Sequence, residues 1–502
     1  MKEKKGILLF NPRAAESRAR IPNSILSLAA SVQHAFDWVI VDGNLEKNPL
    51  EKIFQYLESG RFSIFGCTVM PGIQIREAIP FSAAVKKAFP QVCIVWGGYF
   101  PAAHTETVLK SGFVDAVVIG PGGDSILRIL HALHEGQELQ GIPNVYFRTD
   151  HGIYRGPAEK PLATGLFPEL PYETLDAMYP LPLYLKRGFL GEHIMTFHSS
   201  FGCPSDCSFC AVPGLFHRAW FACDADTIVN EIMKVRSRWG CDAVEFSDNN
   251  FFVSEDRVKK FAESIKDKGI CWWGEGRVDT LMHYADETLE IMRHSGCKMI
   301  FMGAESGQEE ILELAGKGGS QSGEQILDLA SRLRRFGIIP EFSFVLGFPA
   351  PDERTMLRRT RKEIRFIRQL KKINPDAEII LYVYSPLPGD DNQLQGCVRN
   401  SGLRYPDRLE DWLLPPWRDF DLRRQPETPW SNKKALRLIR DFETVLNAFY
   451  PTISDHRLGR AARALLRGLS FLRYITGICQ FPYELRILLK LLHYRQPEKE
   501  GF

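Results

Sequence analysis

Three cysteines lie within eight residues of the segment SSFGCPSDCSFCAVPG, with the spacing C-x3-C-x2-C. They are Cys203, Cys207 and Cys210, and three thiolates can chelate one metal site. Structural zinc usually takes four ligands in two separated pairs, and the only nearby histidines are His198 and His217. A [4Fe–4S] cluster ordinarily takes four thiolates, so three would leave one iron open to a substrate or cofactor. The residues alone therefore leave zinc and an open iron–sulfur cluster as candidates.

Five segments rich in polar residues or glycine follow these cysteines, each at the end of an apolar run. They are FSDNNF (246–251), GEGRVD (274–279), GAESG (303–307), VLGFP (345–349) and YSPLPGD (384–390). Arg277 in the second segment can bind a carboxylate through two parallel hydrogen bonds. Glycine and proline are also ordinary turn formers, and Arg277 or Glu305 could serve only in salt bridges.

The elements that carry these segments alternate between residues 193 and 392. Apolar runs such as HIMTFHSS and PEFSFVLGFP are separated by helix-period stretches such as DADTIVNEIMKVRSRWG, and several of these stretches end at glycine. Six strand–helix units predict a partial (β/α)6 barrel of the TIM type. Active sites in such barrels lie at the carboxyl ends of the strands, which is where the polar segments fall.

A second alternating series precedes this one and predicts a doubly wound α/β domain over residues 1–146. Its short apolar runs, such as GILLFN and VCIVWGG, are separated by amphipathic helices, which indicates parallel strands covered on both faces. Residues 147–192 are rich in proline and weakly periodic, so we expect a linker there. Residues 393–502 lose the alternation and predict a helical, basic C-terminal region.

The overall composition excludes some classes of protein. The net charge is +2, so the chain as a whole is not drawn toward nucleic acid. No stretch reaches the roughly 18 apolar residues of a membrane span, and the N-terminus does not read as a signal peptide. We therefore expect a cytoplasmic protein. Eleven cysteines in such a chain do not predict a disulfide framework.

The cysteine loop and the strand ends that follow it resemble the radical S-adenosylmethionine (radical SAM) enzymes. The resemblance implies that Cys203, Cys207 and Cys210 hold a [4Fe–4S] cluster whose open iron binds S-adenosylmethionine. It also implies a set of residues that contact S-adenosylmethionine: Phe209, Asp248, Arg277, Glu305, Ser306 and Gly347. The family often has arginine two residues before the first cysteine, and this chain has Phe201 there.

A doubly wound domain before the barrel resembles the subfamily with an N-terminal cobalamin-binding domain. Glycine-rich strand ends would let the backbone approach a large flat ring. The resemblance implies that cobalamin contacts Thr68, Val69, Met70, Gly97, Gly98, Tyr99, Gly120, Pro121 and Gly122. The motif Asp-x-His-x-x-Gly is absent, so the chain resembles the branch that binds cobalamin without a histidine ligand.

From this resemblance we expect a cobalamin-dependent radical SAM enzyme, first of all a methyltransferase acting on an unactivated carbon through a 5′-deoxyadenosyl radical. Oxidative ring formation or rearrangement with the same cofactors is the alternative. Methylthio transfer is disfavoured, because only Cys67 and Cys93 precede the linker. A binding protein without catalytic activity would leave the open iron without a role.

The partners follow less directly from the sequence. We expect a small-molecule substrate, lipid-like or anionic, an electron donor such as flavodoxin or ferredoxin, and no nucleic acid. Lys and Arg outnumber Asp and Glu near the C-terminus and interleave with apolar residues, which allows peripheral membrane contact by the C-terminal helices. A packed helical tail with a solvated basic face explains the same pattern.

Overall fold

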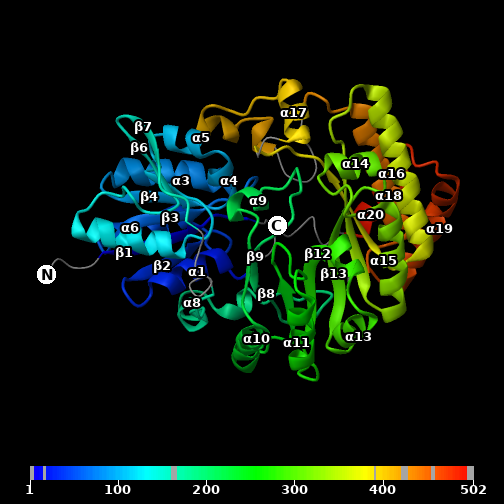
Figure 1. Cartoon of the computed structure of the whole chain (residues 1–502), viewed down its shortest axis with the longest axis horizontal. Coiled ribbons are helices and arrows are strands. Elements are labelled where there is room, and N and C mark those ends of the chain that lie inside the picture. The colour runs from blue at the N-terminus through cyan, green and yellow to red at the C-terminus, as the bar shows by residue number, and fades with distance from the viewer. Residues whose placement is uncertain are drawn as a thin grey trace.

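Two sheets lie beside each other in the computed structural model, with helices around both (Figure 1). The structure describes residues 5–14, 19–159, 167–388, 392–419, 428–453 and 458–494. The N-terminal sheet and its helices occupy one end of the molecule, and the C-terminal helices α18 to α20 occupy the other (Figure 1). No helix in these ranges is long and apolar enough to cross a membrane.

The first sheet has seven strands in the order β2-β1-β3-β4-β5-β6-β7. The parallel strands are β1 (Gly6–Asn11), β2 (Trp38–Asp42), β3 (Phe62–Thr68), β4 (Cys93–Gly97) and β5 (Ala116–Val118). The helices are α1 (Asn23–Val32), α2 (Pro49–Glu58), α3 (Ile75–Ala88), α4 (Tyr99–Ala103), α5 (Thr105–Lys110) and α6 (Gly123–Glu135). All of β1 is buried, as expected of a strand covered on both faces. The strand order reverses beside β1, and ligands of doubly wound sheets bind outside the carboxyl ends of the strands at such a point.

The first sheet continues past the boundary predicted at residue 146. Strands β6 (Val145–Thr149) and β7 (Gly152–Arg155) form an antiparallel hairpin that pairs with β5. The start of the predicted linker, residues 147–155, therefore belongs to the first domain. This hairpin lies at the end of the sheet, with β7 as the edge strand, and nearly all of its residues are exposed or partly exposed, so it lacks the continuous apolar run that marks the inner strands.

Residues 167–192, the last part of the predicted linker, pack between the two sheets. Helix α8 (Tyr172–Met178) and the short 3-10 helix η1 (Leu181–Leu183) bring several buried tyrosines into the interface. The Tyr184 hydroxyl donates to Asp42 Oδ2 at 3.0 Å, and the Tyr179 hydroxyl donates to Glu46 Oε1 at 2.7 Å. Burial raises the pKa of Asp42, and hydrogen bonds from Asn44, Tyr184 and Asn11 oppose that effect. This segment is part of the domain interface.

The second sheet confirms the partial barrel, with six parallel strands in the order β15-β14-β13-β12-β11-β8. The strands are β8 (Ile194–Phe197), β11 (Ala243–Phe246), β12 (Cys271–Arg277), β13 (Cys297–Glu305), β14 (Ile339–Leu346) and β15 (Glu378–Val383). The helices are α10 (Ala225–Trp239), α11 (Glu255–Ile265), α12 (Val278–Met282), α13 (Asp286–His294), α14 (Glu309–Leu314), α15 (Gly323–Phe336) and α16 (Glu353–Ile373). Helix α15 begins with a capping box between Ser322 and Gln325 and ends at Gly337 in the left-handed conformation.

A small unit after β8 carries the cysteines. Strands β9 (Ser200–Gly202) and β10 (Trp220–Ala222) pair antiparallel, and helix α9 (Val212–Phe216) lies between them in sequence. The cysteine loop, residues 203–210, connects β9 to α9. It therefore leaves the carboxyl end of the first barrel strand, as the sequence predicts.

One continuous core joins the two sheets. It contains Ile25 and Leu26 of α1 together with Met195 of β8 and Val244 of β11. At the centre of the interface the Asn23 side chain donates to the Thr196 carbonyl at 3.0 Å. The two domains therefore share buried apolar surface, which is the main favourable term in folding.

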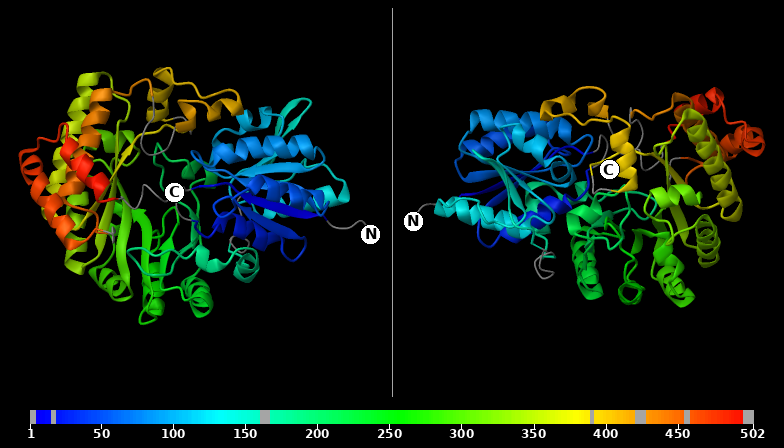
Figure 2. Two further views of the ribbon diagram at one scale, coloured as in Figure 1. Left: turned by 180° about the vertical axis from the view of Figure 1, so that it is seen from behind. Right: turned by 45° about the horizontal axis from the view of Figure 1, so that its top comes forward.

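Residues 392–419, here called the strap, pass over one side of the molecule from the second sheet to the first (Figure 2). The strap contains helix α17 (Gln393–Asn400) and the 3-10 helices η2 (Leu409–Leu413) and η3 (Trp417–Asp419). Asn392 donates to the Ser208 carbonyl in the cysteine loop at 3.2 Å. At the other end Trp412 is buried against Phe100 and His104 of the first domain.

His104, buried against Trp412 and Tyr405, is expected to make the packing of the strap depend on pH. Burial among aromatic rings lowers the pKa of His104 from 6.5 to about 4. In the unfolded chain His104 binds a proton near pH 6.5, whereas in the folded chain it does so only near pH 4. The free energy of unfolding therefore falls as the pH falls from about 6.5 to about 4. The difference amounts to about 3 kcal/mol. We expect hydrogen exchange at η2, corrected for its intrinsic pH dependence, to rise in this window in the wild type and to stay flat in His104→Leu. An equal rise in both proteins would contradict the assignment, and His151→Leu on an exposed turn serves as control.

Candidate functional site

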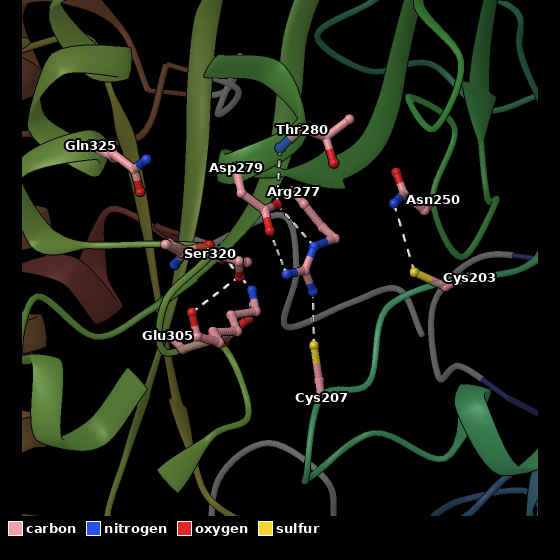
Figure 3. Close-up of polar contacts among 12 residues, drawn as sticks. Cys203, Cys207, Asn250, Arg277, Asp279, Thr280, Glu305, Ser320 and Gln325 are labelled. Atoms are coloured by element: carbon pink, nitrogen blue, oxygen red, sulfur yellow. Dashed lines mark hydrogen bonds and ion pairs between the residues drawn. The ribbon is translucent and has the colours of Figure 1, made fainter. Parts of the chain in front are cut away.

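Each of the three cysteines has a different polar neighbour, and Figure 3 shows those of Cys203 and Cys207. The Asn250 amide donates to Cys203 Sγ at 3.7 Å, and Arg277 Nη1 donates to Cys207 Sγ at 2.9 Å. The backbone N–H of Val212 donates to Cys210 Sγ at 3.4 Å. All three sulfurs thus accept hydrogen bonds, as thiolate ligands of a metal group do.

Burial makes these thiols costly to ionise unless positive charge is near. It raises the pKa of Cys210 to about 12, with Cys207 and Cys203 adding to the effect. It also raises the pKa of Cys207, and the cations Lys317 and Arg277 oppose that rise. Within the described ranges, no three His, Cys, Asp or Glu side chains converge on one point as ligands of a single metal ion. The residues that fit an iron–sulfur group are therefore the three thiols and the two cations near them. The buried Asn250 Oδ1 also fits, because it has no hydrogen-bond partner among the described residues.

Arg277 lies between the cysteine loop and a carboxylate of its own chain (Figure 3). Its Nε and Nη2 donate to the two oxygens of Asp279 at 2.9 and 2.6 Å. The sequence predicted that Arg277 can bind a carboxylate through two hydrogen bonds, and in the structure that carboxylate is Asp279. The remaining arm of the guanidinium faces Cys207, and the contact of Arg277 with S-adenosylmethionine stays a prediction.

Glu305 forms a buried ion pair with a partner, Lys317, that the sequence did not identify. Lys317 Nζ lies 2.7 Å from Glu305 Oε1 and donates to the Gly303 carbonyl at 2.6 Å. Only 2% of the Lys317 side chain and 6% of the Glu305 side chain are exposed. Glu305 has a positive φ of 57°, which is rare for a residue with a side chain and frequent at functional sites.

The loop that carries Lys317 packs directly on the cysteine loop. The Ser208 N–H donates to the Ala315 carbonyl at 3.0 Å. A Cβ on Gly316 would lie 2.7 Å from the Asp206 carbonyl oxygen, so only glycine permits this approach. The sequence analysis missed Lys317 because it considered the ends of strands, and Lys317 lies beyond them. Its one signal in the sequence is its place in the glycine-rich run AGKGG.

Ser306 faces helix α16 and binds a carboxylate there. Its hydroxyl donates to Glu363 Oε2, and the Gly307 N–H donates to Glu363 Oε1 at 2.8 Å. Burial raises the pKa of Glu363, against the hydrogen bonds from Ser306 and Gly307. Through Glu363, Ser306 holds the end of β13 against α16. The predicted contact of Ser306 with S-adenosylmethionine stays a prediction.

Asp248 and Asn249 position the start of the cysteine loop. Asp248 is 1% exposed and accepts from the Ser199 N–H at 2.7 Å and from the hydroxyls of Ser199 and Ser200 at 2.6 Å each. Asn249 accepts from the Gly202 N–H at 3.0 Å. These bonds engage both oxygens of Asp248 in ordering the cysteine loop, and its predicted contact with S-adenosylmethionine stays a prediction.

An aromatic cluster closes the other side of the cysteine loop. Phe348 stacks on Tyr384 at 4.8 Å and meets Phe209 edge to face at 6.4 Å. Gly347 has a φ of +79°, and its carbonyl accepts from Trp430 Nε1 at 3.0 Å. Trp430 comes from the C-terminal region and was missed, because nothing in the sequence links it to the fifth strand. Gly389 and Asp390 of the predicted sixth segment lie outside the described residues.

Phe201 stands where the family often has arginine, and it is accommodated by stacking. Its ring lies 5.3 Å from that of Phe167 and 5.9 Å from that of His198, with all three rings nearly parallel. Burial lowers the pKa of His198, which favours a neutral imidazole in the stack. An apolar stack therefore replaces the polar contacts of an arginine.

The predicted cobalamin contacts gather at the carboxyl ends of β3, β4 and β5, but they differ in what they touch. Val69 is buried and is held by hydrogen bonds with Gly97 and Phe100. Thr68 and Pro121 are partly exposed, and Met70 is 40% exposed. Gly122 packs against Leu28 of α1, so it serves the packing of two helices. The contacts with cobalamin remain predictions.

Two residues of this edge meet the cysteine-bearing unit. The Tyr99 hydroxyl accepts from Asn249 Nδ2 at 2.9 Å, and Asn249 in turn holds Gly202. Burial raises the pKa of Tyr99, and the nearby Cys210 thiol adds to the rise. Gly120 has a φ of +72°, and a Cβ there would lie 3.2 Å from the Leu215 carbonyl oxygen in α9. The ligand-binding edges of the two sheets thus face each other.

A substitution at Gly98 tests how tightly the backbone packs at the carboxyl ends of these strands. It has a φ of +102°, and a Cβ would lie 2.8 Å from the Val69 carbonyl oxygen. We expect Gly98→Ala to lower the free energy of unfolding by about 1–3 kcal/mol, as measured by urea denaturation. Gly72→Ala is the control, because Gly72 has a φ of +97° with nothing within 4 Å of the added atom. Equal losses in both variants would show that backbone strain alone, and not the contact with Val69, sets the cost.

The fold and the site together define a radical SAM enzyme with a B12-binding domain. The family profile described as the radical SAM superfamily matches residues 198–359, and that described as the B12 binding domain matches residues 21–130. The chain therefore belongs to the B12-binding radical SAM enzymes. These two domains imply a [4Fe–4S] cluster, S-adenosylmethionine and cobalamin as cofactors.

Individual relatives are distant. An uncharacterized methyltransferase of Pyrococcus horikoshii is 28% identical over 76% of this chain and 81% of its own length. The anaerobic magnesium-protoporphyrin IX monomethyl ester cyclase of Synechocystis is 26% identical over 67% of this chain and 66% of its own. Among solved structures, the cobalamin-dependent radical enzyme OxsB with aqua-cobalamin bound superposes with a TM-score of 0.71 at 15% identity, over 98% of this chain and 75% of that one. At that identity the likeness shows the fold alone.

Proposed function

We propose that this protein is a cobalamin-dependent radical SAM methyltransferase that transfers a methyl group to an unactivated carbon of a small molecule. The observation that carries the proposal is the contact between the two ligand-binding edges. Tyr99, at the edge of the B12-binding sheet, binds Asn249, which also holds the backbone of the cysteine loop. A reaction that uses both cofactors on one substrate requires them to share a cavity, and this contact brings their binding edges together.

Some residues of the site would bind the cofactors directly, and others position or support those residues. Cys203, Cys207 and Cys210 would ligate the cluster, and the sheet edge around Gly97 and Tyr99 would receive the corrinoid. When bound, the cluster supplies the electron that cleaves S-adenosylmethionine, and the corrinoid supplies a carrier for the methyl group. Arg277 and Lys317 bring positive charge to the anionic thiolates and so favour their ionised form.

The surrounding residues order the cysteine loop and shield one side of it from water. Asp248 and Asn249 fix the entry to the cysteine loop, and Glu363 fixes the end of β13 through Ser306. The aromatic cluster of Phe209, Phe348 and Tyr384 removes apolar surface from water beside Cys210. Exclusion of water protects a reactive radical from side reactions.

The names of several relatives support transfer of a methyl group. Besides the protein of Pyrococcus horikoshii, a cytidylyl-2-hydroxyethylphosphonate methyltransferase of Streptomyces wedmorensis is 22% identical over 52% of this chain and 53% of its own length. We propose a small-molecule substrate and an electron donor such as flavodoxin or ferredoxin for this chain as well.

The test needs no knowledge of the substrate. The protein is reconstituted anaerobically with iron, sulfide and hydroxocobalamin, freed of unbound material, reduced, and given S-adenosylmethionine. We expect about four irons per chain, a retained corrinoid whose visible spectrum changes on addition of S-adenosylmethionine, and both S-adenosylhomocysteine and 5′-deoxyadenosine as products. A protein that retains no corrinoid would overturn the proposal.

A second function uses the same cofactors for oxidative ring formation or rearrangement, and the likeness to the cyclase of Synechocystis favours it as the alternative. Formation of 5′-deoxyadenosine by a corrinoid-loaded protein without S-adenosylhomocysteine would support this alternative. Methylthio transfer is a weaker candidate. The two cysteines before residue 203, Cys67 and Cys93, lie in neighbouring strands of the first sheet. Two cysteines are fewer than the three thiols that a second cluster of the same kind would need.

A further inference from the structure

The outward faces of the last two helices expose a large apolar surface. Helices α19 (Arg460–Thr476) and α20 (Tyr483–Leu491) follow α18 (Lys433–Phe449), whose buried side chains belong to the main core. The exposed residues, here called the apolar face, are Leu465, Leu469, Phe471, Leu472, Ile475, Ile478, Phe481, Tyr483, Ile487 and Leu491, each 46–72% exposed. Monomeric proteins seldom expose a contiguous apolar area of this kind unless it meets a partner.

The spacing along α19 places these residues on one side. At 100° per residue, Leu465, Leu469, Leu472 and Ile475 lie on the side opposite to the buried line of Leu466, Ser470 and Tyr474. The arc between them also holds Ala461, Ala464 and Gly468, so it carries no charge. Two arginines of the helix, Arg460 and Arg473, flank this arc. Arg463 and Arg467 lie on the side that packs on the protein, where Arg463 binds the Leu458 and Pro451 carbonyls and Arg467 lies over the Phe449 ring. Such a division is typical of helices that lie in a membrane surface.

Both helices are held firmly against the rest of the protein. Arg368 of α16 donates to the carbonyls of Tyr474 and Ile475 at 2.9 and 3.0 Å, and Phe449 of α18 stacks on Tyr474 at 4.5 Å. The buried Asp441 of α18 pairs with Arg486 of α20 and accepts from the Phe481 N–H at 3.0 Å. The apolar face is therefore a fixed surface of the folded protein.

The charge around the apolar face indicates which kind of partner can bind there. Residues 458–494 contain six lysines and arginines and a single acidic residue, Glu484, which pairs with Arg473. Two copies meeting through this face would bring positive charges together, which opposes self-association. Nucleic acid would meet an apolar centre instead of a cationic one. A bilayer with anionic headgroups satisfies both features, since it takes apolar side chains below the headgroups and attracts lysine and arginine at their level.

We infer that α19 and α20 dock this protein on the surface of an anionic lipid bilayer, with the apolar face in the membrane and the flanking Arg460 and Arg473 at the headgroups. The face lies at the end of the molecule opposite to the B12-binding sheet (Figures 1 and 2). It is also separated from the cysteine loop by the second sheet and α16. Docking there leaves the strap and the contact between the domains uncovered.

The experiment uses the full chain and vesicles of phosphatidylcholine, with and without phosphatidylglycerol. We expect the wild type to sediment with the anionic vesicles and to be released by salt. Leu472→Glu, at a site 72% exposed, should weaken this binding about tenfold or more, since one buried leucine contributes about 1.5–3 kcal/mol. Leu183→Glu is the matched control, because Leu183 is 57% exposed on the 3-10 helix η1 and should leave binding unchanged.

Two results would overturn the inference. One is a wild type that ignores anionic vesicles, or a Leu472→Glu variant that binds them equally well. The other is a dimer, detected by light scattering, that Leu472→Glu dissociates, because the face would then join two copies. Cleavage of S-adenosylmethionine by the reconstituted protein is measured in parallel and should be equal in wild type and Leu472→Glu. A failure of the proposed function is thereby distinguished from a failure of docking.

Discussion

Cys207→Ser is expected to abolish cleavage of S-adenosylmethionine, with iron after reconstitution falling from about four per chain to less than about one. The expectation is strict because the loop supplies only three thiols, so no spare ligand compensates for a lost one. The change also removes the acceptor of Arg277 Nη1 in a buried site, and a donor left without its partner costs about 1–3 kcal/mol more. Iron, sulfide and 5′-deoxyadenosine are the quantities to measure.

Cys397→Ser provides the control for this experiment. Cys397 lies in α17 of the strap, is similarly half-buried, and contributes no ligand in the proposed site. It should retain full iron and full activity. Wild-type iron content in Cys207→Ser would contradict the assignment of the cluster to the loop.

Lys317→Met is expected to cause the largest loss of stability among the changes considered. It would leave the Glu305 carboxylate buried without its cation, beside a strained backbone and the anionic cysteine loop. Breaking a buried pair by removing one partner costs about 3–5 kcal/mol. We expect a lower free energy of unfolding in urea and a cluster that loses iron faster under a chelator.

Two comparisons separate this ion pair from a general effect of removing charge. Adding Glu305→Gln to Lys317→Met should restore part of the stability, because no charge is then stranded. Lys110→Met removes an exposed lysine that pairs with Glu106 on the surface, and surface pairs contribute little. A loss in Lys110→Met as large as that in Lys317→Met would refute the proposed role of the buried pair.

The architecture could be predicted because the inner strands differ sharply from their surroundings. Runs such as GILLFN and FSFVLGFP are apolar on both faces, and the helices between them keep a regular period. The hairpin of β6 and β7 was missed because an edge strand buries little, and its residues read as a polar turn. The segment around α8 was missed because its tyrosines are buried by contacts with a distant part of the chain, such as that of Tyr184 with Asp42.

The sequence was enough to predict the cysteine ligands of the site, but not the residues that hold the site in place. Three closely spaced cysteines constrain chemistry by themselves, and the carboxyl ends of parallel strands meet at one edge. The partners of those residues come from far along the chain, as with Ser306 and Glu363 or Gly347 and Trp430. A single sequence does not reveal which of many acidic or aromatic residues a fold will bring to a given strand end.

The continuous core limits how this protein can be recombined with others. The B12-binding part looks like a cassette in sequence, yet Ile25 and Leu26 of α1 share one core with Met195 of β8. A chimera joined anywhere between residues 130 and 198 would pair foreign surfaces there and strand the Asn23 amide that binds Thr196. An exchange that preserves folding must transfer α1, β8 and the tyrosines of the intervening segment as one set.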